Sequence, residues 1–90
     1  MSDDVTWWLY LLACADGRTY AGIALDVDVR FQQHVAGKAA KFTRSNKPLR
    51  ILGVQGFATK GEALRAELAL KSLPQPEKLE WARRRPRQAR

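Results

Sequence analysis

The stretch VTWWLYLLACADGRTYAGI, residues 5 to 23, decides the fold of this chain. Its first part, Val5 to Cys14, is apolar and rich in aromatic side chains, which is typical of a buried strand. Ala15-Asp16-Gly17 is a turn signal, and Arg18 to Ile23 continues as a second strand. The stretch therefore predicts an antiparallel hairpin.

The length of the hairpin loop determines where two tyrosines point, because successive side chains of a strand alternate between its faces. With a two-residue loop, Asp16-Gly17, Tyr10 and Tyr20 would point to opposite faces. With a three-residue loop, Tyr10 pairs with Gly22, both tyrosines share a face, and Gly17 takes a positive φ. Asp-Gly fits either loop, so local propensity leaves the choice open. Only a site shared by both tyrosines requires the longer loop.

The remaining sequence predicts helices around a third strand. Asp26 and Thr59 are of the types that cap helices, and Gly37 suits a helix end. Lys38 to Pro48 is expected to be a basic, polar connection. The expected elements are a helix from Asp26 to about Ala36, a strand over Leu49 to Phe57, a helix from about Lys60 to Leu73 and a short helix over Glu77 to Arg83. The order β-β-α-β-α-α predicts a small mixed α/β (α+β) domain, with a three-stranded antiparallel sheet flanked by helices.

Size and charge narrow the class of protein. Ninety residues allow one domain, expected over residues 1–82, with residues 83–90 as a basic, flexible tail. Sixteen Lys and Arg against nine Asp and Glu give a net charge of +7, which favours nucleic acid first and an acidic membrane surface second. An inert basic surface is the alternative. The start lacks the basic residues of a secretory signal, and no apolar run has the length of a membrane span, so we expect a cytoplasmic protein.

Helix positions supply three candidate functional residues. Glu67 falls inside the apolar arc of its helix, where a carboxylate is costly unless it is paired or bound to a metal. The alternative is an ion pair with Lys71, four residues further on. Arg30 and His34 are also four residues apart, so they should project together toward one edge of the core. For them the alternative is a solvated helix edge.

The strands and the basic connection supply further candidates. Taken singly, Tyr10 and Tyr20 are more typical of core aromatics than of catalytic residues. Gly22, a glycine inside a strand, indicates close approach of a backbone or a ligand. Four basic side chains are arranged to follow a phosphate backbone, with plain solvation as the alternative. They are Lys38, Lys41, Arg44 and Lys47.

Taken in order, these residues resemble those of a known family. Trp8-Leu9-Tyr10 and Tyr20-Ala21-Gly22 stand where the GIY-YIG nuclease family has its Gly-Ile-Tyr and Tyr-Ile-Gly motifs. Arg30 and Glu67 stand at the helix positions of the family's functional arginine and glutamate. Gly37 to Arg44 is similar to the Gly-x-x-x-Lys-Tyr-Thr-Arg stretch of its short, single-domain bacterial members.

The resemblance implies the roles of a phosphodiester hydrolase. Tyr10 would act as the base or orient the water, and Tyr20 would position metal-bound water and the phosphate. Arg30 would hold the phosphoryl oxygens with help from His34, and Glu67 would bind Mg²⁺ or Mn²⁺. A free tyrosine, with a pKa of about 10, is a poor base. The role of Tyr10 therefore depends on Arg30 and the cation, which both favour the phenolate.

The implied function is that of a divalent-metal-dependent endonuclease hydrolysing phosphodiester bonds in DNA, branched or damaged DNA included, with a place in DNA repair. A nucleic-acid-binding module on the same fold, with weak or lost catalysis, is the alternative. Two departures favour it: Phe42 lacks the hydroxyl of the family's tyrosine, and a later asparagine of the longer nucleases has no match. A basic adaptor on the ribosome or a membrane is a third class. We expect the protein to bind DNA in preference to RNA and to have no membrane partner. We expect it to be a monomer or a weak dimer, and the sequence leaves a protein partner open.

Overall fold

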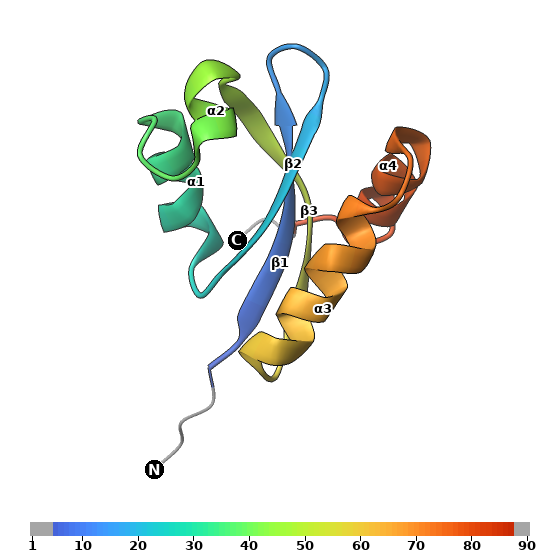
Figure 1. Cartoon of the computed structure of the whole chain (residues 1–90). Helices are drawn as coiled ribbons and strands as arrows, with labels where there is room; N and C mark the ends of the chain where they lie inside the picture. The colour runs from blue at the N-terminus through green and yellow to red at the C-terminus, as the bar shows by residue number, and fades with distance from the viewer. Residues whose placement is uncertain (1–4, 88–90) are drawn as a thin grey trace.

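The computed structural model describes residues 5–87, which form a three-stranded sheet with helices on both faces (Figure 1). In chain order the elements are β1 (Trp7–Cys14), β2 (Thr19–Ala24), α1 (Val27–Val35), α2 (Lys41–Ser45), β3 (Pro48–Phe57), α3 (Lys60–Lys71) and α4 (Gln75–Arg83). The strands lie in the order β2-β1-β3, and both pairs are antiparallel. The predicted fold class is confirmed. Among residues 5–87, no helix is long and apolar enough to cross a membrane.

The most apolar strand, β1, lies in the middle of the sheet and is covered on both faces. Leu9, Leu11 and Leu12 are all 0% exposed. Burial of such a side chain contributes about 1.5 to 3 kcal/mol relative to leaving it in water. Because side chains alternate along the strand, Leu9 and Leu11 belong to one core cluster, and Tyr10 and Leu12 to another.

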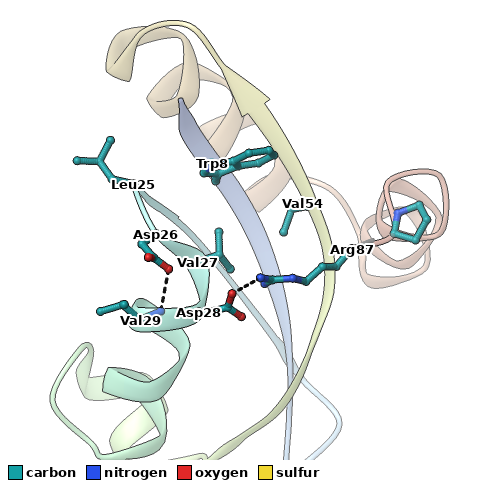
Figure 2. A pocket seen from close by; sticks show the side chains of 9 residues that line it. Trp8, Leu25, Asp26, Val27, Asp28, Val29, Val54 and Arg87 are labelled. Atoms are coloured by element: carbon teal, nitrogen blue, oxygen red, sulfur yellow. Dashed lines mark hydrogen bonds and ion pairs between the residues drawn. The ribbon is translucent and has the colours of Figure 1, made fainter. Parts of the chain in front are cut away.

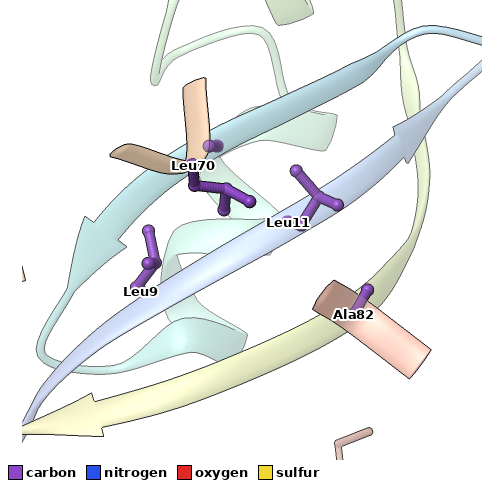
Figure 3. Close-up of a cluster of buried hydrophobic side chains, with 5 residues drawn as sticks. Leu9, Leu11, Leu70 and Ala82 are labelled. Atoms are coloured by element: carbon purple, nitrogen blue, oxygen red, sulfur yellow. The ribbon is translucent and has the colours of Figure 1, made fainter. Parts of the chain in front are cut away.

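The first cluster lies between the sheet and the helices α3 and α4 (Figure 3). Leu70 of α3 and Ala82 of α4 pack with Leu9 and Leu11 of β1. Helix α3 begins as the sequence predicts, because the hydroxyl of its N-cap, Thr59, accepts a hydrogen bond from a backbone N–H of the first turn at 3.1 Å. This face of the sheet is therefore closed by the C-terminal half of the chain.

The second cluster lies between the sheet and α1. Its buried members are Tyr10, Leu12, Ala24 and Val27. Asp26 is the N-cap of α1, as predicted, and its carboxylate accepts from the Val29 N–H at 3.1 Å. Tyr20 and Phe31 are partly buried against the same cluster. Both tyrosines thus belong to one cluster on one face of the sheet, and α1 and α2 cover that face (Figure 1).

The hairpin takes the longer of the two loops. Tyr10 pairs with Gly22, and Gly17 has a φ of 91°. The Gly17 N–H donates to the Cys14 carbonyl at 3.0 Å, and the Cys14 N–H donates to the Arg18 carbonyl at 2.9 Å, which closes a three-residue loop. Glycine adopts a positive φ without steric cost. The register required for a site shared by both tyrosines is confirmed.

Two stretches differ from the expectation. The basic connection contains a short helix, α2, whose N-cap, Ala40, makes no side-chain cap hydrogen bond. The sequence therefore carries no start signal for this helix. Helix α4 begins at Gln75 instead of Glu77, with Pro76 in its first turn. A proline there loses no hydrogen bond, since the first N–H groups of a helix have no partner within it.

The segment after α4 crosses the outer edge of β3 and reaches α1. The Val54 N–H donates to the Arg85 carbonyl at 2.9 Å, and the Arg85 side chain donates to Gln55 Oε1 at 2.8 Å. Arg87 then pairs with Asp28 of α1, beside a pocket at the start of that helix (Figure 2). The segment expected to be a loose tail is in contact with the fold up to Arg87, and residues 88–90 lie outside the described residues.

Candidate active site

Tyr10 is the centre of a hydrogen-bonded cluster on the α1 face of the sheet. Its side chain lies across Gly22 of β2, so closely that a Cβ at this position would lie 2.4 Å from the Tyr10 hydroxyl oxygen. The hydroxyl oxygen lies 2.8 Å from Nε2 of His34, and Tyr10 is 2% exposed. The close approach predicted at Gly22 is therefore made by Tyr10, and Gly22 itself is buried.

His34 is 1% exposed, and both of its ring nitrogens are hydrogen-bonded. Nδ1 lies 2.7 Å from the Thr43 hydroxyl oxygen, and this hydroxyl donates to the Ala40 carbonyl at 3.2 Å. Because a hydroxyl has a single proton to donate, Nδ1 must carry the proton in its bond with Thr43. Nε2 is then the acceptor of the neutral ring, and the Tyr10 hydroxyl donates to it. The chain of bonds from Tyr10 to Ala40 fixes both the orientation and the tautomer of His34.

Burial determines where the proton of this pair lies. It raises the pKa of Tyr10 to about 12, although the Arg30 guanidinium opposes the rise. Burial, together with the charge of Arg30, lowers the pKa of His34 to about 4. Arg30 does favour the phenolate, as expected, but burial outweighs it in the free protein. At neutral pH the proton therefore stays on Tyr10 and His34 is neutral.

Arg30 lies on α1, one turn before His34 and beside the same pair. It is half-buried, and its Nη1 donates to Gln33 Oε1 at 2.9 Å. Its positive charge lowers the pKa of both Tyr10 and His34, so it acts on both groups of the pair. Arg30 and His34 thus face one edge of the core, as predicted. For His34 the alternative of a solvated helix edge is wrong.

Tyr20 also contacts the imidazole of His34. The ring centroids of Tyr20 and His34 are 5.0 Å apart, and those of Tyr10 and His34 are 5.8 Å apart. Tyr20 also stacks on Phe42, with 5.8 Å between centroids and 21° between the ring planes. His34 therefore joins the two tyrosines into one cluster, in which Tyr20 is the more exposed member.

Glu67 belongs to α3, on the other side of the sheet, and pairs with Lys71. Its Oε2 lies 3.0 Å from the Lys71 Nζ. The ion pair that the sequence leaves as an alternative is therefore present. The Lys71 Nζ also lies 5.9 Å from the centroid of the Tyr20 ring, and the charge of Glu67 raises the pKa of Tyr10. The pair thus lies at the open edge of β2, within electrostatic reach of the tyrosines.

The apolar arc that surrounds Glu67 is buried on one side only. Ala63 and Leu70 are 0% and 2% exposed, whereas Leu64 and Leu68 are 42% and 70% exposed. Glu67 therefore lies at the border of the core, with 15% of its side chain exposed. The helix wheel correctly indicated that the Glu67 carboxylate needs a positively charged partner, but it overstated how deeply Glu67 is buried.

The residues fit a divalent cation that is shared with a substrate. Among residues 5–87, no group of three or more His, Cys, Asp or Glu side chains lies close enough together to hold a metal ion. Mg²⁺ is commonly held by one or two carboxylates, with waters and substrate phosphates completing its shell. Glu67 offers one such carboxylate at a partly open edge, so these residues fit an open cation site and not a closed metal cage.

The four basic side chains that are predicted to follow a phosphate backbone are all exposed. They are Lys38, Lys41, Arg44 and Lys47. Two of them, Lys41 and Arg44, belong to α2, the helix that also carries Thr43. The basic surface therefore begins next to the buried cluster. Exposure suits contact with phosphates and plain solvation equally.

Sequence reasoning missed Thr43. It is 2% exposed and holds His34 in place, yet the two residues lie on different helices. No periodicity marks a threonine between basic residues in a polar segment. The available signal was the similarity of Gly37 to Arg44 to a family stretch that includes a threonine.

Comparison with known proteins identifies the family of this chain. Residues 6–80 match the profile of the GIY-YIG catalytic domain. The chain belongs to the GIY-YIG family, a family of nuclease domains. This GIY-YIG domain is 54% identical over 79 residues to a UPF0213 protein of Cupriavidus pinatubonensis, with 88% of each chain covered. It is 46% identical over 81 residues to a UPF0213 protein of Xanthomonas axonopodis pv. citri, covering 90% of this chain and 79% of the relative.

Two solution NMR structures are similar to this GIY-YIG domain. A UPF0213 protein of Bacillus halodurans is 37% identical with a TM-score of 0.54, covering 87% of this chain and 83% of the other. A protein of E. faecalis is 29% identical with a TM-score of 0.61, covering 93% and 90%. The short, single-domain bacterial branch that the motifs indicate is thus confirmed. Membership in a nuclease family makes nucleic acid the expected substrate class.

Proposed function

We propose that this GIY-YIG domain is a divalent-metal-dependent endonuclease that hydrolyses phosphodiester bonds in DNA, branched or damaged DNA included. The observation that carries the proposal is the 2.8 Å hydrogen bond from the Tyr10 hydroxyl to Nε2 of a neutral, oriented His34. Hydrolysis needs a group that takes a proton from the attacking water, and groups that stabilise the charge developing on phosphorus. A hydroxyl with a proton acceptor held behind it supports the first of these roles.

Tyr10 and His34 would move the proton in one relay. As the Tyr10 oxygen accepts a proton from the attacking water, its own proton passes to Nε2 of His34, which keeps its Nδ1–H bond to Thr43. The pKa values of about 12 and about 4 oppose this transfer in the free protein. A phosphate bound beside the pair adds negative charge, which raises the pKa of His34. Substrate binding would therefore favour the relay.

Arg30 and Tyr20 would supply the contacts to the phosphate. A guanidinium binds two phosphoryl oxygens in a planar fork and remains charged at any working pH. Arg30, half-buried beside the tyrosines, is placed to stabilise the charge that develops on these oxygens. Tyr20, more exposed than Tyr10, would position the phosphate from the β2 side.

Glu67 would hold the Mg²⁺ or Mn²⁺ at the edge of β2. When bound, the cation supplies charge stabilisation at the phosphoryl oxygens and lowers the pKa of a coordinated water. Lys71 pairs with the same carboxylate, and its side chain is 49% exposed, so it is free to move aside. The net charge of +7 and the exposed lysines and arginines near α2 support contacts to the DNA backbone that weaken as salt rises.

A binding module with weak or lost catalysis is the second candidate, and two observations favour it. The Glu67 carboxylate is already paired with Lys71. Tyr10 is buried, and its pKa is raised and not lowered. Both features disfavour catalysis at the cluster. Neither affects the basic surface, which could still bind nucleic acid.

Cleavage of flaps, forks, single strands and RNA in Mg²⁺ or Mn²⁺ separates the two candidates. For the nuclease, Glu67→Gln should lose metal-dependent cleavage while it keeps its fold and its affinity for DNA, and Lys71→Ala should still cleave. Wild-type protein that binds these substrates and cleaves none of them would establish the binding module. Equal destabilisation in Glu67→Ala and Lys71→Ala, with no effect of metal, would leave Glu67 a purely structural role.

A further inference from the structure

Three planar groups, Tyr20, Phe42 and Arg18, contact one another in succession beside the Tyr10–His34 pair, and this series is called the row. The Tyr20 ring stacks on the Phe42 ring, and the Arg18 guanidinium carbon lies 4.8 Å from the centroid of the Phe42 ring. Phe42 is half-buried, and the Arg18 side chain is 66% exposed. The row therefore leads from the buried imidazole of His34, through two aromatic rings, to a cation at the surface.

Side-chain hydrogen bonds join the hairpin loop to α2 beside this row. The Arg18 Nε donates to Asp16 Oδ2 at 2.6 Å, and Asp16 Oδ1 accepts from Asn46 Nδ2 at 2.7 Å. Asn46 is the C-cap of α2, the helix that carries Phe42, and it is 6% exposed. The loop and the helix are thus tied across the row, which keeps the Phe42 ring at a defined place beside the Tyr10–His34 pair.

The contacts that hold Arg18 over the Phe42 ring are weak, so another group can replace it there. An ion pair between exposed groups contributes little, and a cation over an aromatic ring contributes little when water reaches it. A nucleobase is also planar, and it stacks on an aromatic ring whatever its identity. A base that takes the place of the guanidinium keeps the Phe42 ring covered and frees Arg18 for a phosphate, which a guanidinium binds well.

We propose that Phe42 is a stacking platform for an unpaired nucleobase of the strand whose phosphate lies at Tyr10 and His34. This inference rests on the proposed function for the position of that phosphate. Tyr20 connects the two places, because its ring contacts both His34 and Phe42. Lys41 and Arg44 flank Phe42 on α2 and are exposed, which suits contact with neighbouring phosphates.

The platform determines the class of nucleic acid that fits. Inside a duplex each base is covered by its neighbours, so it reaches a protein ring only after it leaves the stack. Single strands, flaps and nucleotides flipped out at damaged or mismatched positions present a free face without that cost. The chain should therefore prefer such strands, of DNA or RNA, over a continuous duplex.

The test measures binding in EDTA, where no cleavage takes place. The probe is a single-stranded oligonucleotide with a central 2-aminopurine, whose fluorescence reports stacking, and the reference strand has an abasic site at that position. Wild type and Phe42→Tyr should bind the 2-aminopurine strand more tightly than the abasic strand. Phe42→Leu keeps an apolar side chain without a ring. It should bind the 2-aminopurine strand about tenfold more weakly and should not distinguish the two strands.

Phe31→Leu is the matched control, because Phe31 is another half-buried phenylalanine, packed against the core cluster of Tyr10 and Leu12. It should bind both strands as wild type does. Arg18→Ala opens the Phe42 ring without touching the core, and it should keep the preference for the 2-aminopurine strand. This variant decides the question if Phe42→Leu does not fold.

Unchanged affinity and strand preference in Phe42→Leu would overturn the platform, as would the absence of any strand preference in wild type and Arg18→Ala. The two proposals fail separately, since this assay needs neither metal nor cleavage. A chain that cleaves DNA but ignores the loss of the ring refutes the platform alone. A chain that binds bases through Phe42 but cleaves none of the substrates refutes the nuclease alone.

Discussion

Lowering the pH from 7 to 4 should destabilise this fold through His34. In the unfolded chain the pKa of His34 has its ordinary value of 6.5, and in the fold burial lowers it to about 4. Between these values the unfolded state binds a proton that the folded state does not, so the free energy of unfolding falls as the pH falls. At about 1.4 kcal/mol for each pH unit, the difference between the two pKa values corresponds to a loss of about 3 kcal/mol. A domain of this size has only about 5 to 15 kcal/mol to lose.

The chain has a single histidine, so its imidazole signals in NMR spectra need no further assignment. Their titration in the folded protein should have a midpoint near 4. Urea unfolding at several pH values between 7 and 4 should show the wild type losing about 3 kcal/mol more than His34→Gln, whose amide takes up no proton. Asp16 and Glu80, whose pKa values are lowered in the fold, also lose stabilisation in acid. Both proteins share these carboxylates, so the comparison isolates His34.

A folded-state midpoint near 6.5 would refute this reasoning, because it would mean that the imidazole charges as readily as it does in water. Parallel loss of stability in the wild type and in His34→Gln would refute it as well. Either result would mean that burial does not suppress the charge of His34 in the folded protein, which is the premise of the predicted loss of stability in acid.

Substitutions at three positions test the rest of the cluster. Gly22→Ala should displace the Tyr10 ring, since the new Cβ would lie 2.4 Å from its hydroxyl oxygen and 2.7 Å from Cζ; thermal unfolding should show a loss of about 1 to 3 kcal/mol. Thr43→Val leaves the Nδ1–H of His34 without an acceptor, at a cost of about 1 to 3 kcal/mol; Thr43→Ser should restore most of the stability and of any cleavage. Arg30→Lys keeps the charge but loses the planar fork, so kcat should fall more than the affinity for DNA; full activity in Arg30→Ala would contradict the assigned role.

The strands and the longer helices could be predicted because their signals are local. Asp26 and Thr59 cap α1 and α3 as expected, with side-chain hydrogen bonds of 3.1 Å in both cases. The loop of the hairpin was different, since Asp16-Gly17 fits two registers. The requirement that Tyr10 and Tyr20 share a site selected the register that the structure has. A functional constraint between distant residues thus resolved what local propensity left open.

Helix α2 and its role could not be predicted, because what holds it is not local. Its five residues are too few for a helix that is stable by itself, and its N-cap makes no side-chain hydrogen bond. Its anchors are the bond from His34 to Thr43 and the bond from Asn46 to Asp16. Both anchors join segments that meet only in the folded chain. Thr43, which fixes the tautomer of His34, therefore lies in the helix that has the weakest signals in the sequence.

The ion pair of Glu67 with Lys71 and the binding of a divalent cation are compatible properties of one carboxylate. A glutamate at the border of the core needs a positive partner, and a lysine four residues further on along the helix supplies one. An exposed ammonium on a flexible stem gains little from such a pair, about 0 to 1 kcal/mol. A divalent cation that also contacts a bound phosphate gains more, because it is held from two sides. Lys71 therefore keeps the carboxylate paired in the free protein and leaves it able to take up the divalent cation that the proposed function requires.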